Sequence, residues 1–207
     1  PAEGRVSDHL PILLFLVPFL AAVAMPLVTV KRRGWCQPIT LAAISLMAIL
    51  ALINLRTVLI QGPMEYALGG WAAPVGIAWS NDSLAAVVVL TVSAVSLLTL
   101  LFGRLAISSK LDRSMAYYTL VLLLLAGQVG IVFAADLFNL FVFLEVSALA
   151  SYALVGAGGG RGAVYAFRYL LLGSLGAALY LLGVSHLYIA TGTLNMADLA
   201  TRLPALM

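Results

Sequence analysis

Four ionisable residues lie inside long apolar stretches of this chain: Arg56, Glu145, Arg168 and His186. An ionised side chain near the centre of a bilayer costs about 2.5 kcal/mol or more, so such residues often mark functional sites in membrane proteins. The chemistry that these residue types support is proton transfer. A carboxyl and an imidazole both change charge when they bind a proton, and a neighbouring cation shifts that equilibrium.

Glu145 is the strongest of these candidates. It follows Asp136 by nine residues, which in a helix corresponds to about 13 Å and places the carboxyl near the midplane of a bilayer. The helical face around Glu145 carries apolar and aromatic side chains, so a partner for its charge must come from another helix, or the carboxyl must be protonated. Moving a cation toward and away from Glu145 would then move a proton, as a pump or an antiporter requires. The alternative is a glutamate that only holds helices together, as a static ion pair or as a neutral acid.

The other three ionisable residues have simpler explanations. Arg168 lies near the start of the last apolar stretch and is expected to extend toward the headgroups, with an electrostatic effect on the buried carboxyl or on a proton path as the alternative. His186 lies near the other end of that stretch, where an interfacial histidine is the simpler interpretation and a proton relay the alternative. Arg56 is expected to reach the interface or to pair with Glu65 or Asp82.

Gln128 and Ser151 are uncharged polar candidates. Gln128 lies between two glycines, a pattern typical of close helix packing with a hydrogen bond between helices, and lining of a water chain is the alternative for both residues. The single cysteine, Cys36, excludes an internal disulfide and a cysteine-based metal site. The sequence contains no cofactor-binding motif and no metal-ligand cluster, so neither a cofactor nor a bound metal is predicted.

The elements that position these residues follow from composition. Hydrophobic residues make up 63% of the 207-residue chain and charged residues 9%, whereas a soluble domain is about a quarter charged. This composition excludes a soluble enzyme and a nucleic-acid-binding domain. It predicts an all-α membrane protein with six transmembrane helices, forming a single transmembrane region over 1–207 without a soluble domain. The predicted helices span 10–30, 38–60, 83–103, 115–135, 137–157 and 163–190.

Segment 61–82, between the second and third helices, predicts a small β-hairpin on the outer surface. Its strands are expected in Tyr66–Leu68 and Val75–Trp79, around a turn rich in Gly and Pro. Trp71 and Trp79 are expected at the membrane interface. Asp82 and Asp136 precede apolar runs, and both are expected to cap the helices that follow.

Basic residues predict the orientation, because loops on the cytoplasmic side are rich in Lys and Arg. Arg5 and Arg202 lie in segments on one side of the predicted helices. The loops on the other side, after the first, third and fifth helices, hold Lys31, Arg32, Arg33, Arg104, Lys110, Arg113 and Arg161. Both termini are therefore predicted on the non-cytoplasmic side of the cell (inner) membrane.

Segment Asp136–Tyr152, DLFNLFVFLEVSALASY, resembles the fifth transmembrane helix of the antiporter-like proteins. These are the large subunits of Mrp-type sodium/proton antiporters and their relatives in respiratory complex I. Tyr66–Trp71 resembles the outer hairpin of that family, Arg168–Gly176 its sixth helix, and Ala190–Leu199 the loop that follows. The D-type branch of the Mrp subunits is the nearest match, and the quinone-reductase branch is next.

By this resemblance, Glu145 corresponds to a helix-five glutamate that takes part in proton transfer and pairs with a lysine in helix seven. Arg168 stands where the family usually has a lysine. Because arginine does not deprotonate readily, the resemblance leaves it an electrostatic role. Family members continue through a broken helix seven and a second, inverted repeat. The chain is therefore expected to be the N-terminal portion of such a subunit, with the lysine-bearing helix outside it.

The resemblance implies an ion-translocating subunit, or a fragment of one, in a multisubunit monovalent cation/proton antiporter. Its partners would be other membrane subunits, the lipid bilayer, protons and sodium, with no cofactor and no nucleic acid. One alternative is a proton-pumping membrane subunit of NADH-quinone oxidoreductase or of a related membrane hydrogenase, where the chain would belong to a translocase. The other alternative is a structural assembly module without transport activity of its own.

Overall fold

The structure, a computed structural model, describes residues 9–29, 33–71, 76–106 and 114–206. Within these residues, six helices are long and apolar enough to cross a membrane. The six predicted helices are confirmed, and the chain is a multi-pass membrane protein. The helices are α1 (Leu10–Thr29), α2 (Cys36–Gln61), α3 (Ser83–Ala106), α4 (Ser114–Phe133), α5 (Leu137–Ala157) and α6 (Gly162–Thr191).

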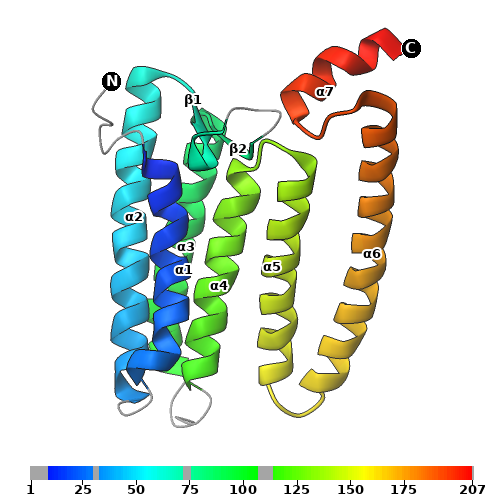
Figure 1. Cartoon of the computed structure of the whole chain (residues 1–207). Coiled ribbons are helices and arrows are strands. Elements are labelled where there is room, and N and C mark those ends of the chain that lie inside the picture. The colour runs from blue at the N-terminus through cyan, green and yellow to red at the C-terminus, as the bar shows by residue number, and fades with distance from the viewer. Residues whose placement is uncertain (1–8, 30–32, 72–75, 107–113, 207) are drawn as a thin grey trace.

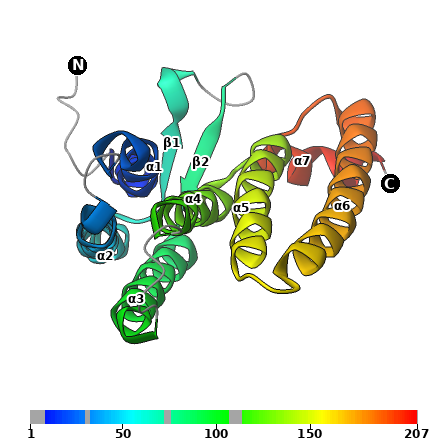
Figure 2. The same ribbon diagram turned by 90° about the horizontal axis from the view of Figure 1, so that it is seen from below.

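The helices α1 to α4 form a cluster, and α5 and α6 extend from it as a row (Figures 1 and 2). In the view along the helices, α4 lies between α1 and α3 on one side and α5 on the other. Packing is closest between α4 and α5, α1 and α4, α5 and α6, and α2 and α3. Helix α6 lies at the edge of the molecule and packs along α5, so most of its surface is exposed in this chain.

One end of the molecule carries the predicted hairpin, and this end is called the hairpin side. Strand β1 (Met64–Ala67) pairs antiparallel with β2 (Ala78–Asn81), with Met64 opposite Asn81. The hairpin is confirmed, although β2 begins later than the predicted run, whose first residue, Val75, lies outside the described residues. The opposite end of the molecule, called the loop side, carries the turn between α5 and α6.

Trp79 is not exposed on the surface of the bundle, as an interfacial tryptophan would be. Only 1% of the residue is exposed. Its ring stacks on Phe133 of α4, and it meets Phe15 of α1 and Phe143 of α5 edge to face. The strand β2 turns this side chain into the bundle, where burial of a large aromatic ring outweighs the interfacial preference of tryptophan. Trp71, in contrast, is exposed.

Two irregular segments extend the hairpin across the bundle. The turn between α4 and α5 pairs with β2 through a bridge between Trp79 and Ala134. The same turn pairs with the loop before α7 (Met196–Arg202) through a bridge between Asp136 and Asn195. Backbone hydrogen bonds support the pairing, including Leu137 N–H to the Leu194 carbonyl at 3.0 Å. The hairpin, this turn and this loop are together called the hairpin-side strip.

Both predicted capping residues act as caps. A carboxylate oxygen of Asp82 accepts a hydrogen bond from the backbone amide of Ala85 at 2.7 Å, and Asp136 accepts one from Asn139 at 2.6 Å. Three short 3-10 helices complete the described structure, at Arg33–Trp35, Leu68–Gly70 and Leu203–Leu206. Several basic residues that predict the orientation lie outside the described residues, namely Arg5, Lys31, Arg32, Lys110 and Arg113.

Candidate functional site

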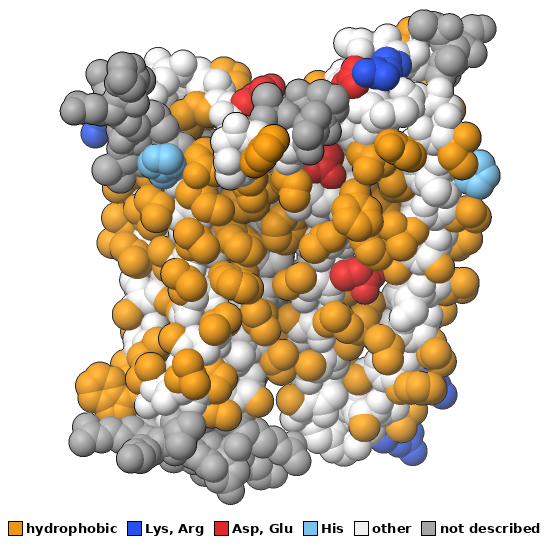
Figure 3. All heavy atoms as spheres, viewed as in Figure 1, with side chains coloured by type: hydrophobic (Ala, Val, Ile, Leu, Met, Phe, Trp, Pro, Cys, Tyr) orange, Lys and Arg blue, Asp and Glu red, His pale blue; other side chains and the backbone are white. Residues whose placement is uncertain are grey.

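Glu145 lies near the middle of the 21-residue α5, and its side chain is half-buried. It is the only acidic residue in the membrane-spanning helices that the structure describes. Figure 3 shows an apolar belt across the molecule, with an acidic side chain halfway up the region of α5 and α6. In the described part of the chain, no other side chain forms a hydrogen bond or an ion pair with the Glu145 carboxyl.

The residues one to two turns from Glu145 on the same helical face contact α6. Toward the hairpin side, the ring of Phe141 stacks on Tyr180, with centroids 6.0 Å apart. Toward the loop side, the ring of Tyr152 meets Tyr169 edge to face at 4.6 Å. Residues spaced by three, four or seven share a helical face. Glu145 is therefore directed to the contact zone between α5 and α6, which is called the α5–α6 seam.

The opposite face of α5 packs tightly on α4. A Cβ atom at Gly127 would lie 2.9 Å from the backbone nitrogen of Ser147, and one at Gly130 would overlap the ring of Phe143. Small residues at such positions let two membrane helices approach closely. The packing predicted around Gln128 is therefore present, but the neighbouring glycines make the contact.

The Gln128 side chain itself lines a different space. This hollow, of about 180 Å³, lies between α3 and α4 and is also lined by Ser96, Thr99 and Tyr117. The hydroxyls of Ser96 and Thr99 donate to carbonyls of their own helix. Gln128 of α4 therefore faces α3, away from the α5–α6 seam.

The remaining predicted residues are spread along the molecule. The hydroxyl of Ser151 donates to the Ser147 carbonyl at 2.9 Å, within α5. Arg168 is exposed, near the loop side of α6. His186 is exposed near the hairpin side, where its ring nitrogen donates to the Leu182 carbonyl at 2.7 Å. Arg56 is exposed, and no described carboxylate forms an ion pair with it.

Asp136 stands at the hairpin-side end of the seam. Burial raises the pKa of its carboxyl above the ordinary value of 3.8, and hydrogen bonds from the backbone amides of Asn139 and Phe138 oppose that shift. On the neighbouring helix, the Tyr180 hydroxyl donates to the carbonyl of Leu137, the next residue. The sequence identified Asp136 only as a cap, because its neighbours on α6 and α7 are remote in the chain.

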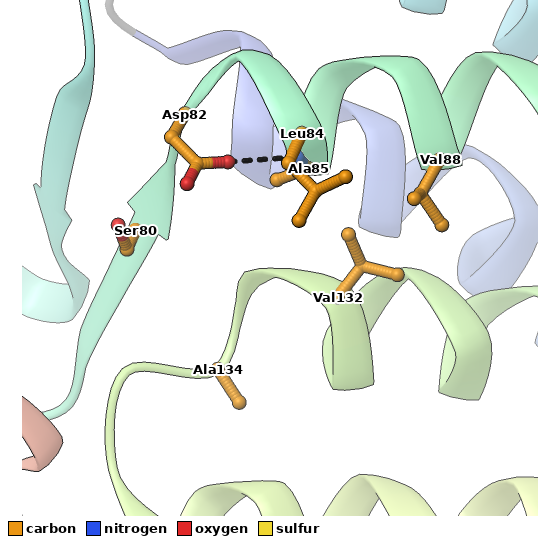
Figure 4. Close-up of a pocket in the computed structure, with 7 residues that line it drawn as sticks. All are labelled: Ser80, Asp82, Leu84, Ala85, Val88, Val132 and Ala134. Atoms are coloured by element: carbon orange, nitrogen blue, oxygen red, sulfur yellow. Dashed lines mark hydrogen bonds between the residues drawn. The ribbon is translucent and has the colours of Figure 1, made fainter.

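A second carboxylate on the hairpin side borders a hollow of about 370 Å³ between β2, α3 and α4 (Figure 4). Asp82 and Ser80 contribute its polar edge, and Val88 and Val132 contribute apolar walls. One Asp82 oxygen is already engaged by the amide of Ala85. Among the described residues, no group of three or more His, Cys, Asp or Glu side chains could hold a metal ion.

Comparison with known proteins agrees with the fold. Residues 134–206, which contain α5, the α5–α6 seam and α7, match the family described as NADH:quinone oxidoreductase/Mrp antiporter, TM. The chain is 40% identical over 204 residues to NADH-quinone oxidoreductase subunit N of Desulforudis audaxviator. It is 36% identical over 197 residues to the D subunit of a Na(+)/H(+) antiporter of Bacillus subtilis. The chain is related to the antiporter-like membrane subunits.

The matched regions cover nearly all of this chain but only part of each relative. They include 98% of the chain and 41% of the oxidoreductase subunit, and 95% of the chain and 40% of the antiporter subunit. The chain thus spans about two fifths of the length of these curated relatives.

Solved structures show the same antiporter-like fold. A chain of the archaeal membrane-bound sulfane sulfur reductase superposes with a TM-score of 0.87 at 34% identity, over 93% of this chain and 40% of that one. A chain of the Mrp complex from Dietzia sp. superposes with a TM-score of 0.78, over 94% of this chain and 36% of that one. At 24% identity, the second likeness concerns the fold alone.

Proposed function

We propose that this chain is part of an ion-translocating subunit of a multisubunit monovalent cation/proton antiporter, in which Glu145 binds and releases the transported proton. The observation that carries the proposal is the position of Glu145. It is a half-buried carboxyl in the middle of a membrane-spanning helix, directed to the seam with α6. Intramembrane carboxyls of this kind mark proton and ion pathways in transporters.

The proposed mechanism uses the electrostatics of that position. Burial favours the neutral acid, whereas a nearby cation favours the carboxylate. A cation that approaches Glu145 therefore releases its proton, and a cation that withdraws allows reprotonation. We assign the cation to a lysine on a helix outside this chain. Na⁺ is the proposed counter-ion because the Bacillus subtilis relative is named as part of a Na(+)/H(+) antiporter.

The proposal places the complex in the cell (inner) membrane, with other membrane subunits as partners. The hairpin side, which carries both ends of the described chain, is assigned to the non-cytoplasmic side. The support is the basic residue Arg161 at the turn between α5 and α6, together with the Lys and Arg residues that the sequence places after the first and third helices. Arg168, on the same side, is assigned an electrostatic rather than a proton-carrying role.

The test is Glu145→Gln in the assembled complex, reconstituted in vesicles, with proton uptake measured against an imposed sodium gradient. A fall of about 100-fold or more is expected, since a proton-transfer group is lost. Glu65→Gln, which removes an exposed carboxyl on β1, is the matched control and should transport normally. Normal transport by Glu145→Gln would refute the proposal. If deletion of the whole chain nevertheless abolished transport, the chain would be a structural assembly module.

A second candidate is a proton-pumping subunit of an NADH-quinone oxidoreductase or a related redox-driven membrane complex. It is favoured by the 40% identity to an oxidoreductase subunit N and by the TM-score of 0.87 with a chain of an archaeal respiratory complex. Purification of the native complex separates the two. Flavin and iron–sulfur absorbance in stoichiometric amounts would select the redox-driven assembly, and their absence from an active complex would select the antiporter.

A further inference from the structure

Tyr152 lies seven residues beyond Glu145 on the same face of α5, about 10 Å closer to the loop side. Only 8% of the residue is exposed. Its ring packs edge to face on Tyr169 of α6, with centroids 4.6 Å apart. The two side chains therefore lie in the same seam, one behind the other.

The Tyr152 hydroxyl occupies space beside Gly173 of α6, where a larger side chain would not leave room for it. A Cβ atom at Gly173 of α6 would overlap the hydroxyl oxygen, so any larger residue there would displace it. At Gly176, one turn closer to the hairpin side, a Cβ atom would meet no atom within 4 Å. The contacts of Phe141 with Tyr180 and of Tyr152 with Gly173 place this open part of α6 roughly level with Glu145.

Most of Tyr152 is buried, but its hydroxyl oxygen is not among the fully buried polar atoms that lack a partner, and no hydrogen bond of this hydroxyl is found in the described part of the chain. The hydroxyl of a buried tyrosine usually has a partner, because leaving one unpaired is unfavourable. Water in the open part of the seam is a partner that a hydroxyl can both donate to and accept from.

We propose that the Tyr152 hydroxyl relays protons, through water, between Glu145 and the loop side, and that Gly173 positions it. This inference rests on the proton-binding role proposed for Glu145. In each transfer, a hydrated proton on the loop side gives a proton to the phenol oxygen while the phenolic proton passes to a water on the Glu145 side. At the phenol oxygen one O–H bond forms and one breaks, so the phenol remains neutral, and the second water becomes a hydronium ion. The second water then protonates the Glu145 carboxylate.

The test compares Tyr152→Phe with Tyr169→Phe in the assembled complex in vesicles. Both changes remove one hydroxyl and keep the ring, but Tyr169 is 48% exposed, whereas Tyr152 is 8% exposed. Tyr152→Phe is expected to slow proton transport roughly tenfold, the effect of one hydrogen bond lost from a transition state. Its apparent affinity for sodium should not change, and Tyr169→Phe should resemble wild type.

Two further measurements separate a relay from a packing effect. The ratio of transport rates in H₂O and D₂O should increase in Tyr152→Phe, because proton delivery becomes rate-limiting, and the thermal stability of the complex should be unchanged. In infrared spectra, the carbonyl band of protonated Glu145 should appear more slowly after a pH jump applied from the loop side.

The outcomes distinguish the two proposals. Loss of transport in Glu145→Gln together with wild-type rate and isotope ratio in Tyr152→Phe would overturn the relay alone. Slow transport in Tyr152→Phe with an unchanged isotope ratio and lower thermal stability would also overturn it, as a packing defect. Normal transport in Glu145→Gln would overturn the proton-binding role of Glu145 and, with it, the relay that rests on that role.

Discussion

The hydroxyl of Tyr180, in the middle of α6, donates a hydrogen bond of 3.0 Å to the carbonyl of Leu137, the first residue of α5. The bond joins the two helices at the hairpin-side end of their seam. The stacking of Tyr180 on Phe141 holds the same ring in place. Tyr180 therefore acts together with the backbone bonds of the hairpin-side strip to hold α5 and α6 together at the end that Asp136 caps.

Removal of that hydroxyl should loosen α6. Tyr180→Phe is expected to lower the free energy of unfolding by about 0.6 to 1 kcal/mol, the value of one hydrogen bond between membrane helices. Thermal unfolding of the purified protein in detergent measures the change. Tyr188→Phe, an exposed position on the same helix, is the matched control. An equal effect of both changes would contradict a specific bond to Leu137.

Two glycines of α4 should not accept a methyl group. Gly127→Ala is expected to lower the free energy of unfolding by about 1 to 3 kcal/mol, because the new Cβ would press on the backbone of Ser147 and force the helices apart. Gly130→Ala should act similarly against Phe143. Gly183→Ala meets no atom within 4 Å and should leave stability unchanged or slightly higher. Comparable losses at Gly127 and Gly183 would show that helix packing is not the cause.

The amides of Asn54 and Asn81 hydrogen-bond each other in both directions, at 3.2 and 2.8 Å, and both residues are fully buried. Asn81→Ala should lower the free energy of unfolding by about 1 to 3 kcal/mol, because it leaves the Asn54 amide unpaired. Replacing both by leucine should recover part of the loss. A double-mutant cycle measures the coupling, and additive losses would show that the two amides act independently.

Asp136 should make stability depend on pH. Because burial raises the pKa of this carboxyl in the folded protein, its contribution to stability is present below about pH 4 and is lost as the pH rises through the folded pKa. Asp136→Asn keeps a capping oxygen but cannot ionise. The stability of the variant relative to wild type should therefore increase from about pH 4 toward neutrality. Thermal unfolding across that range is the measurement, and a relative stability that decreased with pH would contradict the assignment.

Features that depend on local chemistry could be predicted from the sequence. The helix that carries Glu145 follows from its apolar run and from Asp136, whose carboxylate needs only the amide of Asn139 three residues on. The hairpin follows from turn residues between two short runs. Its register, with Met64 opposite Asn81, depends on which side chains the bundle buries, and periodicity in one strand does not specify that.

Features that depend on two remote segments could not be predicted. Tyr152 and Gly173 are ordinary residues of two apolar helices, and only the packing of α5 on α6 brings the hydroxyl to the glycine. Trp79 is amphipathic and suits an interface, but three aromatic rings from α1, α4 and α5 surround it. The sequence carries one local signal at the paired residues Asp136 and Asn195, because each is of a type that caps helices and each caps the helix that follows it. That signal does not indicate that the two residues pair.

The hairpin-side strip has a consequence for motion. Backbone hydrogen bonds join β2 to the turn before α5 and join that turn to the loop after α6. The backbone hydrogen bonds of the strip resist separation of its segments. At the loop side, in contrast, α5 and α6 are joined by the turn at Gly158–Arg161 and by side-chain contacts. A tilt of α6 would therefore pivot about the strip, and it would change the side-chain contacts of the α5–α6 seam, including that of Tyr152 with Tyr169.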